Sequence, residues 1–403
     1  MIPARLARRF KPGLAGQNRR SIPMEIRELG NTGIRVGVVG LGCEGLLDKA
    51  PEYYAKALDL MERAGANCID LYSPSPVLRT NLGHALKGRR EKFVLQGHLC
   101  TVWEDGQYKC TRDLQKVRSS FEDQLKRLRT DYLDIGMIHY VDSLANWKRV
   151  TESGIMDYAL GLRKKGVIRA LGLSSHNPRV ALEAVQEGAI EVLMFSVNPC
   201  YDLQPADEDV EQLWNREKYK EPLTNMDADR ARLYEACMER GVGITVMKAF
   251  GGGDLLHAER SLAGMALTAH QAIAYALDRP AVACVLAGAR SLAELEECLA
   301  YASGSGSADY AEVLAAFPRI SWKGHCMYCG HCAPCTEHID IAVVIKLLNL
   351  AEAQNEVPET VREHYRALPV RADACSKCGV CETRCPFEVK IREHMARAQE
   401  VFS

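Results

Sequence analysis

Short apolar runs alternate along the chain with amphipathic segments, and this alternation indicates the fold. The apolar runs have the length and β-branched content of strands, whereas the segments between them repeat apolar residues at helical spacing. The predicted strands cover residues 36–39, 67–70, 92–96, 133–138, 167–172, 191–197, 242–247 and 282–287. The predicted helices that follow them cover residues 51–65, 77–88, 111–129, 145–165, 178–188, 227–240, 268–279 and 291–302. Eight such pairs over about 280 residues favour a (β/α)8 TIM barrel over an open sheet.

Two segments outside this repeat belong to the barrel ends. Residues 30–33, Gly-Asn-Thr-Gly, predict the turn of a hairpin that closes the bottom of the barrel. Residues 199–226 predict a long loop at the top, suited to a lid or a docking surface. The glycines at 40–45 match a dinucleotide-binding fingerprint, but a Rossmann fold needs its helix to begin there. Because Pro51 marks the first helical position instead, we disfavour that fold.

The cysteines divide the chain into two parts. Eight of the 16 cysteines are scattered over residues 43–298, and the other eight fall within residues 326–385. A chain of 403 residues exceeds the size of one ordinary core, so a second domain is expected. We predict a disordered leader over 1–23, with Met24 as the natural start, a barrel over 24–318, and a separate tail over 319–403.

The tail has the cysteine spacing of a two-cluster ferredoxin. Three thiolates two residues apart bind one corner of a [4Fe–4S] cluster, and a fourth followed by Pro commonly belongs to the other cluster. The predicted ligands of the first cluster are Cys326, Cys329, Cys332 and Cys385. Those of the second cluster are Cys375, Cys378, Cys381 and Cys335. Two structural zinc ions are the alternative. Since residues 341–368 have apolar positions at helical spacing, we predict an all-α ferredoxin-like module.

Composition and charge argue against some classes of partner. The net charge is -1 and 47% of the residues are hydrophobic, so the chain has no global field for nucleic acid and can bury a sizeable core. No apolar run is long enough to cross a bilayer, and the Arg-rich leader lacks the apolar segment of an export signal. We expect a cytoplasmic protein that binds a small-molecule substrate and no membrane.

Polar residues at the predicted strand ends form the candidate site, because a TIM barrel places its chemistry there. Asp70, His98 and His139 end three successive strands and are expected to converge. A carboxylate beside two imidazoles favours their protonated forms and so supplies a general acid. The same three residue types also suit an iron or zinc ion. Lys248 and Arg290, after the last two strands, predict an anion site.

With these residues in place, the chain resembles the aldo/keto reductases, and its tail resembles their iron–sulfur branch. The resemblance spans residues 24–403. It rests on the segments MEIRELGNTGIRVGVVGLG, DYLDIGMIH, GVIRALGLSSH, MKAFGGGDLL and LAGARSLAELEECL, and on Asp70 followed by Gly83. The resemblance implies an NADPH-dependent carbonyl reductase in which a Tyr donates a proton, assisted by Lys, Asp and His.

The resemblance assigns site residues, and two positions depart from the family pattern. Asp70 and His139 match the tetrad, whereas Ser75 stands at the Tyr position and His98 at the Lys position. A serine cannot replace a phenol as the acid, and Tyr72, on the face of Asp70, is the nearest substitute. The residues expected to contact the cofactor are Ser174, Ser175, Asn198, Lys248, Gly288, Arg290 and Ser291.

Three functions remain open at this point. The first is an oxidoreductase in which electrons pass between NADPH or an external ferredoxin- or flavodoxin-like carrier and a barrel-bound substrate, with two [4Fe–4S] clusters. The second is a lyase, dehydratase or isomerase that uses Asp70, His98 and His139, with structural clusters. The third is a metal site on these same three residues. The first is the leading hypothesis because a redox tail accompanies a catalytic-looking barrel mouth.

Overall fold

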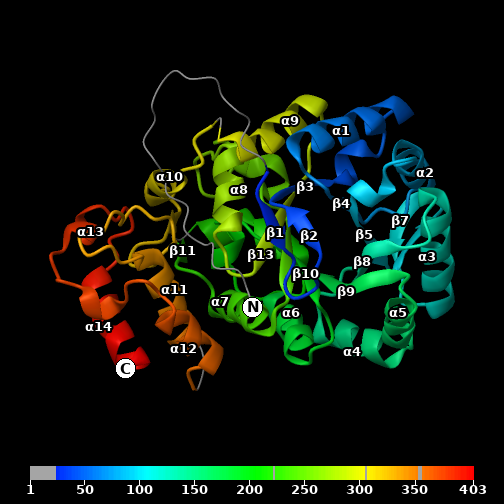
Figure 1. Cartoon of the computed structure of the whole chain (residues 1–403). Coiled ribbons are helices and arrows are strands. Elements are labelled where there is room, and N and C mark those ends of the chain that lie inside the picture. Colours follow the sequence, from blue (N-terminus) through cyan, green and yellow to red (C-terminus); the bar gives the residue numbers. More distant parts are fainter. Residues whose placement is uncertain (1–23, 221–222, 305, 353–355) are drawn as a thin grey trace.

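Eight parallel strands close into a barrel in the computed structural model, which describes residues 24–220, 223–304, 306–352 and 356–403 (Figure 1). The predicted leader over 1–23 lies outside these residues. The strands, in their order around the barrel, are β10 (Val192–Ser196), β12 (Gly243–Met247), β13 (Val282–Ala287), β3 (Val39–Gly42), β4 (Cys68–Leu71), β5 (Val94–Leu99), β8 (Leu133–Ile138) and β9 (Ile168–Ser175). The TIM barrel predicted from the alternation is therefore confirmed.

Helices surround this barrel. They are α1 (Pro51–Ala64), α2 (Pro76–Ala85), α3 (Leu114–Leu128), α4 (Leu144–Glu152), α5 (Ile155–Lys164), α6 (Pro178–Gln186), α7 (Ala228–Arg240), α8 (Ala269–Leu277) and α9 (Leu292–Ala300). Local capping explains their ends: Pro51 opens α1, the Asp113 carboxylate accepts from two backbone N–H groups at the start of α3, and Gly65 ends α1 in a left-handed conformation. No described helix has the length and apolar content needed to span a membrane.

Two of the predicted boundaries were wrong. The run 36–39 is not the first barrel strand: residues Arg35–Gly37 form β2 of a hairpin, and the barrel strand is β3. The segment 145–165 is not one helix, because Gly154 has a φ of 80° and separates α4 from α5. Both differences follow from glycine-containing turns that a hydrophobic pattern does not register.

The hairpin of β1 (Ile26–Glu28) and β2 closes the bottom of the barrel, as predicted. Its turn is anchored where the Asn31 N–H donates to the Gly241 carbonyl oxygen, at the start of β12. Apolar side chains of this hairpin, Leu29, Ile34 and Val36, pack with those inside the barrel, so the interior is a filled core rather than a channel. Ligand chemistry is thereby confined to the opposite end, the mouth.

A second hairpin lies at the mouth and was not predicted. It consists of β6 (Thr101–Glu104) and β7 (Gln107–Cys110), paired antiparallel between β5 and α3. Asp105 and Gly106, both with positive φ, form its two-residue turn. The alternating segment TVWEDGQYKC with its Asp-Gly turn is a hairpin signal that the search for βα pairs passed over.

The tail lies against one side of the barrel, beside α7 and α8 (Figure 1). Its helices are α11 (Ile341–Glu352), α12 (Glu359–Arg366), α13 (Val380–Thr383) and α14 (Ile391–Phe402), after the short α10 (Ala311–Ala315) that precedes the tail. The tail is not wholly helical, because β14 (Ile320–Ser321) pairs with β11 (Leu223–Thr224) of the long loop after β10. The iron–sulfur character of this tail stays a prediction.

Close packing at a glycine gives the first testable expectation. A Cβ on Gly45 would overlap the Ala289 carbonyl oxygen, whereas one on Gly161 of α5 would meet no atom within 4 Å. We expect Gly45→Ala to lower the free energy of unfolding by about 1–3 kcal/mol. The control Gly161→Ala should leave it unchanged or raise it by up to about 1 kcal/mol, because alanine favours a helix. Urea denaturation measures both, and an equal effect of the two variants would refute this account of the packing.

Candidate active site

Three predicted residues meet at the barrel mouth. Asp70, His98 and His139 lie at the ends of β4, β5 and β8, which are neighbours in the barrel, and all three side chains are buried. His98 Nε2 lies 2.8 Å from Asp70 Oδ1, and His98 Nδ1 lies 2.7 Å from His139 Nδ1. The parallel topology thus brings together side chains that are up to 69 residues apart. The residues form a chain of hydrogen bonds with His98 in the middle.

This arrangement removes the metal-site interpretation of the three residues. A metal ion needs several donor atoms directed at one point, but both ring nitrogens of His98 are engaged by its neighbours. Among the described residues, no group of three or more His, Cys, Asp or Glu side chains could hold a metal ion. The geometry therefore favours proton chemistry at the mouth.

The chain of hydrogen bonds continues to a tyrosine that the sequence analysis missed. Tyr108 of β7 places its hydroxyl oxygen 2.7 Å from His139 Nε2 and 2.8 Å from Cys110 Sγ. Its ring also contacts the His139 ring edge-to-face, with centroids 5.8 Å apart. The β6–β7 hairpin therefore delivers a phenol to the histidine of the tetrad. Only the Asp-Gly turn of that hairpin could have pointed to Tyr108 from the sequence.

Burial sets the protonation of the outer residues. Burial, and then electrostatic interaction with His98, His176 and Arg112, lowers the pKa of His139 well below its usual value. The expectation that both imidazoles are protonated is therefore wrong for His139, which is neutral near pH 7. Burial and the hydrogen bond with Cys110 raise the pKa of Tyr108, so its phenol keeps its proton.

One arrangement of protons satisfies every atom of the chain when both histidines are neutral. Tyr108 O–H donates to His139 Nε2, His139 Nδ1–H donates to His98 Nδ1, and His98 Nε2–H donates to Asp70. A second proton on His98, stabilised by the Asp70 carboxylate, reverses the other two hydrogen bonds, from His98 to His139 and from His139 to Tyr108. His139 Nε2–H then donates to the Tyr108 oxygen, and the Tyr108 O–H is released for another acceptor.

The two substitutes considered for the missing tyrosine lie outside this chain. Ser75 is the N-cap of α2, where its hydroxyl accepts from the Leu78 N–H at 3.4 Å. Tyr72 stacks on the His139 ring with centroids 5.9 Å apart. Burial and the charges of Glu44 and Asp70 raise the pKa of Tyr72 to about 12. Ser75 thus has a structural role, and Tyr72 covers the histidine.

Several residues assigned to the cofactor from the family pattern are engaged within the protein. Ser175 Oγ donates to Asp142 Oδ1 at 3.0 Å, and the buried Ser174 provides a carbonyl acceptor for the Val141 N–H. The Asn198 side chain bonds backbone groups, including the Lys248 carbonyl oxygen at 2.9 Å. These contacts shape the mouth, and their role toward a cofactor stays a prediction.

The predicted anion site lies on the loops after β12 and β13. Lys248 has a φ of 61°, and its ammonium lies 5.9 Å from the centre of the Trp214 ring. Arg290 is exposed and reaches the Gly252 carbonyl oxygen at 3.4 Å, next to Gly288, where a Cβ would meet nothing within 4 Å. Ser291 caps α9 by accepting from the Glu294 N–H. The two cations are near solvent and available to an anionic group.

The cysteines of the tail form two groups. In the first, the pKa of Cys326 is raised to about 12 by burial and then by the neighbouring thiols of Cys329, Cys332 and Cys385. Cys385 likewise raises the pKa of Cys329 and of Cys332, so it lies near all three although 53 residues separate it from Cys332. This is the composition expected for the first cluster.

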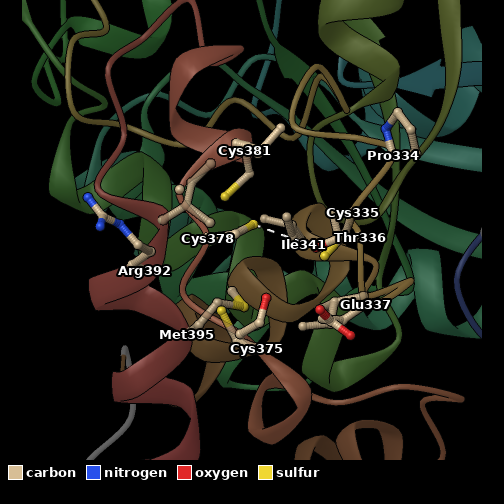
Figure 2. A pocket seen from close by; sticks show the side chains of 15 residues that line it. Pro334, Cys335, Thr336, Glu337, Ile341, Cys375, Cys378, Cys381, Arg392 and Met395 are labelled. Carbon is tan, nitrogen blue, oxygen red and sulfur yellow. Dashed lines mark hydrogen bonds between the residues drawn. The ribbon is translucent and has the colours of Figure 1, made fainter.

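The second group lines one pocket of the tail (Figure 2). Cys335, Cys375, Cys378 and Cys381 are four of the residues that line this small pocket, whose volume is about 20 Å³. The Val380 backbone N–H and the Thr336 hydroxyl, 3.5 Å from Cys378 Sγ, lower the pKa of Cys378 and favour its thiolate. In a [4Fe–4S] cluster each thiolate binds a different iron, so its ligands need not converge as they do on a single ion. The donor sets fit two clusters, which stay a prediction.

The first group of cysteines lies far from the mouth. Met327, between Cys326 and Cys329, accepts a hydrogen bond from Arg279, which lies between the end of α8 and the start of β13. That is the bottom end of the barrel, because strands run from bottom to mouth. A strand of the length of β13 spans roughly 20 Å. The candidate redox and proton sites are therefore at opposite ends.

Comparison with known proteins bears on the barrel. The family model described as "Aldo/keto reductase family" matches residues 34–266, so the tail lies beyond the match. The uncharacterized oxidoreductase YqkF of Bacillus subtilis is 26% identical over 291 residues, which cover 68% of this chain and 90% of YqkF. L-galactose dehydrogenase of Arabidopsis thaliana is 26% identical over 42% of this chain and 56% of its own.

Solved structures share the fold. PA4992 of Pseudomonas aeruginosa has a TM-score of 0.55 and 23% identity, with 71% of this chain and 97% of PA4992 covered. The aldo-keto reductase AKR11C1 of Bacillus halodurans, in its holo form, has a TM-score of 0.55 and 22% identity, with 72% and 93% covered. At this identity the likeness establishes the barrel architecture.

The lowered pKa of His139 gives a pH-dependent expectation. The unfolded chain binds a proton at His139 below its ordinary pKa of about 6.5, whereas the folded chain does not, so stability falls as the pH drops through this value. His139→Gln should reduce this loss by about 1 kcal/mol between about pH 7 and about pH 5. Urea denaturation at both pH values measures it, with His84→Gln, at an exposed site, as the control. An unchanged pH dependence in His139→Gln would contradict the neutral, buried His139.

Proposed function

The chain belongs to the aldo/keto reductase family, and from this premise we propose that it is an iron–sulfur oxidoreductase that reduces a small carbonyl substrate at the barrel mouth. The observation that supports this proposal is the buried chain from Asp70 through His98 and His139 to the Tyr108 hydroxyl. It provides a phenol as the acid, which Ser75 cannot do. When bound, NADP(H) supplies the hydride that accompanies this proton.

Proton delivery follows from the hydrogen bonds. With His98 protonated against the Asp70 carboxylate, Tyr108 O–H points to the substrate oxygen and transfers its proton as negative charge develops there. The tyrosine oxygen takes the proton of His139 Nε2, and His139 Nδ1 takes the proton of His98 Nδ1. His98 ends neutral, so no charge is left on the phenol. His98 thus replaces the lysine of the family tetrad with a group that relays a proton.

The mouth also contains two cationic side chains suited to binding an anion. Lys248 and Arg290 would hold the ribose phosphate of NADP(H) or an anionic substrate, with Gly288 and Ser291 beside them. Neither cation forms a described ion pair at its head group. Ser174 and Ser175, at the end of β9, are engaged within the protein, so the proposed binding of NADP(H) depends on these cations.

The tail is proposed to bind two [4Fe–4S] clusters on its two groups of four cysteines. When bound, the clusters would pass single electrons to or from a ferredoxin- or flavodoxin-like carrier. Since the first group lies at the bottom of the barrel, we expect that carrier to approach the tail rather than the mouth. The family match favours this oxidoreductase over a lyase, dehydratase or isomerase.

Replacement of the phenol tests the proton donor. Tyr108→Phe should lower kcat for NADPH-dependent reduction across a panel of aldehydes and ketones by about 10²-fold or more, because the acid is lost while the ring remains. NADPH affinity, measured by fluorescence titration, should be unchanged. Tyr72→Phe is the matched comparison, since the Tyr72 ring stacks on the same histidine. If Tyr72→Phe abolishes turnover and Tyr108→Phe does not, the assignment is wrong.

Metal analysis tests the tail. After anaerobic reconstitution we expect about eight irons per chain, with equal sulfide. Cys378→Ser should lose about half of this iron, whereas Cys298→Ala, a buried cysteine of the barrel, should lose none. Zinc in place of iron, or iron content that is unaffected by Cys378→Ser, would refute the clusters. Reoxidation of reduced clusters on addition of substrate would connect the tail to the reaction at the mouth.

A further inference from the structure

Arg279 is a buried cation at the contact between barrel and tail. Its side chain is 1% exposed. Its Nη2 donates to the Met327 carbonyl oxygen at 2.9 Å, and its Nε donates to the Tyr275 carbonyl oxygen at 3.3 Å. The guanidinium also lies 4.6 Å from the centre of the Tyr275 ring and 5.7 Å from that of Tyr328. Its Nη1 is buried without a hydrogen-bond partner.

No described carboxylate forms an ion pair with this guanidinium. Asp278, the adjacent residue, accepts instead from the Tyr310 hydroxyl at 2.7 Å, and burial raises the pKa of Asp278. Asp202, farther away, is bound by Arg230 and by two tyrosines. Asp278 and Asp202 attract the guanidinium from beyond ion-pair distance. Its buried Nη1 still lacks an acceptor, so a further negative group on the tail side would be favourable.

A second cation lies beside Arg279. The Lys346 ammonium of α11 is 5.9 Å from the centre of the Tyr328 ring, on which Arg279 also lies. Lys346 has no described ion pair, and burial lowers its pKa to about 8. Arg27 is close to the same group but is paired with Glu25. Arg279 and Lys346 are therefore two neighbouring cations of this contact region that have no described ion pair, with Asp278 as the carboxylate that acts on both.

The first cysteine group lies on the side of Arg279 that faces the tail. Met327, its acceptor, lies between Cys326 and Cys329, and the Tyr310 hydroxyl oxygen lies 2.9 Å from the same carbonyl oxygen. A [4Fe–4S] cluster with four thiolate ligands is an anion in both of its common oxidation states. Net charge and hydrogen bonds around such a cluster set its reduction potential.

We propose that Arg279, with Lys346 beside it, is the counter-charge of the cluster held by Cys326, Cys329, Cys332 and Cys385, and that it raises the reduction potential of this cluster. The inference rests on the proposed function, because it requires the clusters. Reduction adds one electron to the cluster, donated by dithionite in the test or by the carrier protein. The reduced form is more negative, so a fixed positive charge stabilises it more than the oxidised form. Arg279 thus acts through its charge and is not a ligand of the cluster.

Redox titration followed by electron paramagnetic resonance tests this role in the reconstituted full chain. Arg279→Gln should make reduction of one cluster about tenfold less favourable, which is about 59 mV for a one-electron couple. The other cluster, held by Cys335, Cys375, Cys378 and Cys381, should keep its potential. Arg279→Lys keeps the positive charge and should therefore retain most of the wild-type reduction potential. The control Arg397→Gln removes a charge from an exposed, ion-paired residue of the tail and should change neither potential.

The outcomes separate the two proposals. Wild-type protein without iron overturns the proposed function and this inference with it. If each cluster has the same reduction potential in wild type, Arg279→Gln and Arg279→Lys, this inference alone is overturned. Arg279 is then a packing residue. If Arg279→Gln does not fold, Lys346→Gln replaces it, since this side chain is only half-buried. A lowered potential of one cluster in Lys346→Gln supports the inference, and unchanged potentials refute it.

Discussion

The arrangement of the site depends on the hydrogen bond between His98 Nε2 and Asp70 Oδ1, which orients the His98 ring. The same Asp70 oxygen accepts from the Gln96 side-chain amide at 2.7 Å, and the Gln96 oxygen accepts from the Thr245 hydroxyl across the barrel at 3.0 Å. The carboxylate is therefore fixed by groups from two other strands. Since it accepts only, it requires a proton on the facing nitrogen of His98, so the other nitrogen of His98 is the one that exchanges protons with His139.

In the proposed function, a phenol on the β6–β7 hairpin would take the place of the missing tyrosine as the proton donor. A lysine ends in one ammonium, whereas His98 has two nitrogens and bonds Asp70 on one side and His139 on the other. His139 in turn bonds Tyr108 through its second nitrogen. The inserted β6–β7 hairpin is what makes the fourth member possible, because no described strand of the barrel itself places a tyrosine hydroxyl on His139. The site is thus a property of this loop on a common fold.

The barrel separates two environments. Its mouth has buried proton-transfer groups with exposed cations nearby, and its bottom is closed by the β1–β2 hairpin. The tail contacts the outside of the barrel near that bottom, through Trp322 against Tyr275 and through Met327 on Arg279. The two cations Arg279 and Lys346 lie at this contact, next to the first cysteine group. The position of the tail is consequently an electrostatic feature of the molecule as well as a packing one.

The sequence by itself determined the barrel, the bottom hairpin and the strand-end positions of Asp70, His98 and His139, because periodicity and strand order are local signals that the parallel topology converts into proximity. Tertiary structure alone decided that Tyr108, 31 residues before His139, completes the chain, and that Ser75 caps a helix instead. It also decided that burial keeps His139 neutral and that Arg279 of the barrel bonds the Met327 carbonyl oxygen of the tail. These outcomes depend on contacts between distant segments and on the exclusion of water, and neither is encoded in the spacing of residues along the chain.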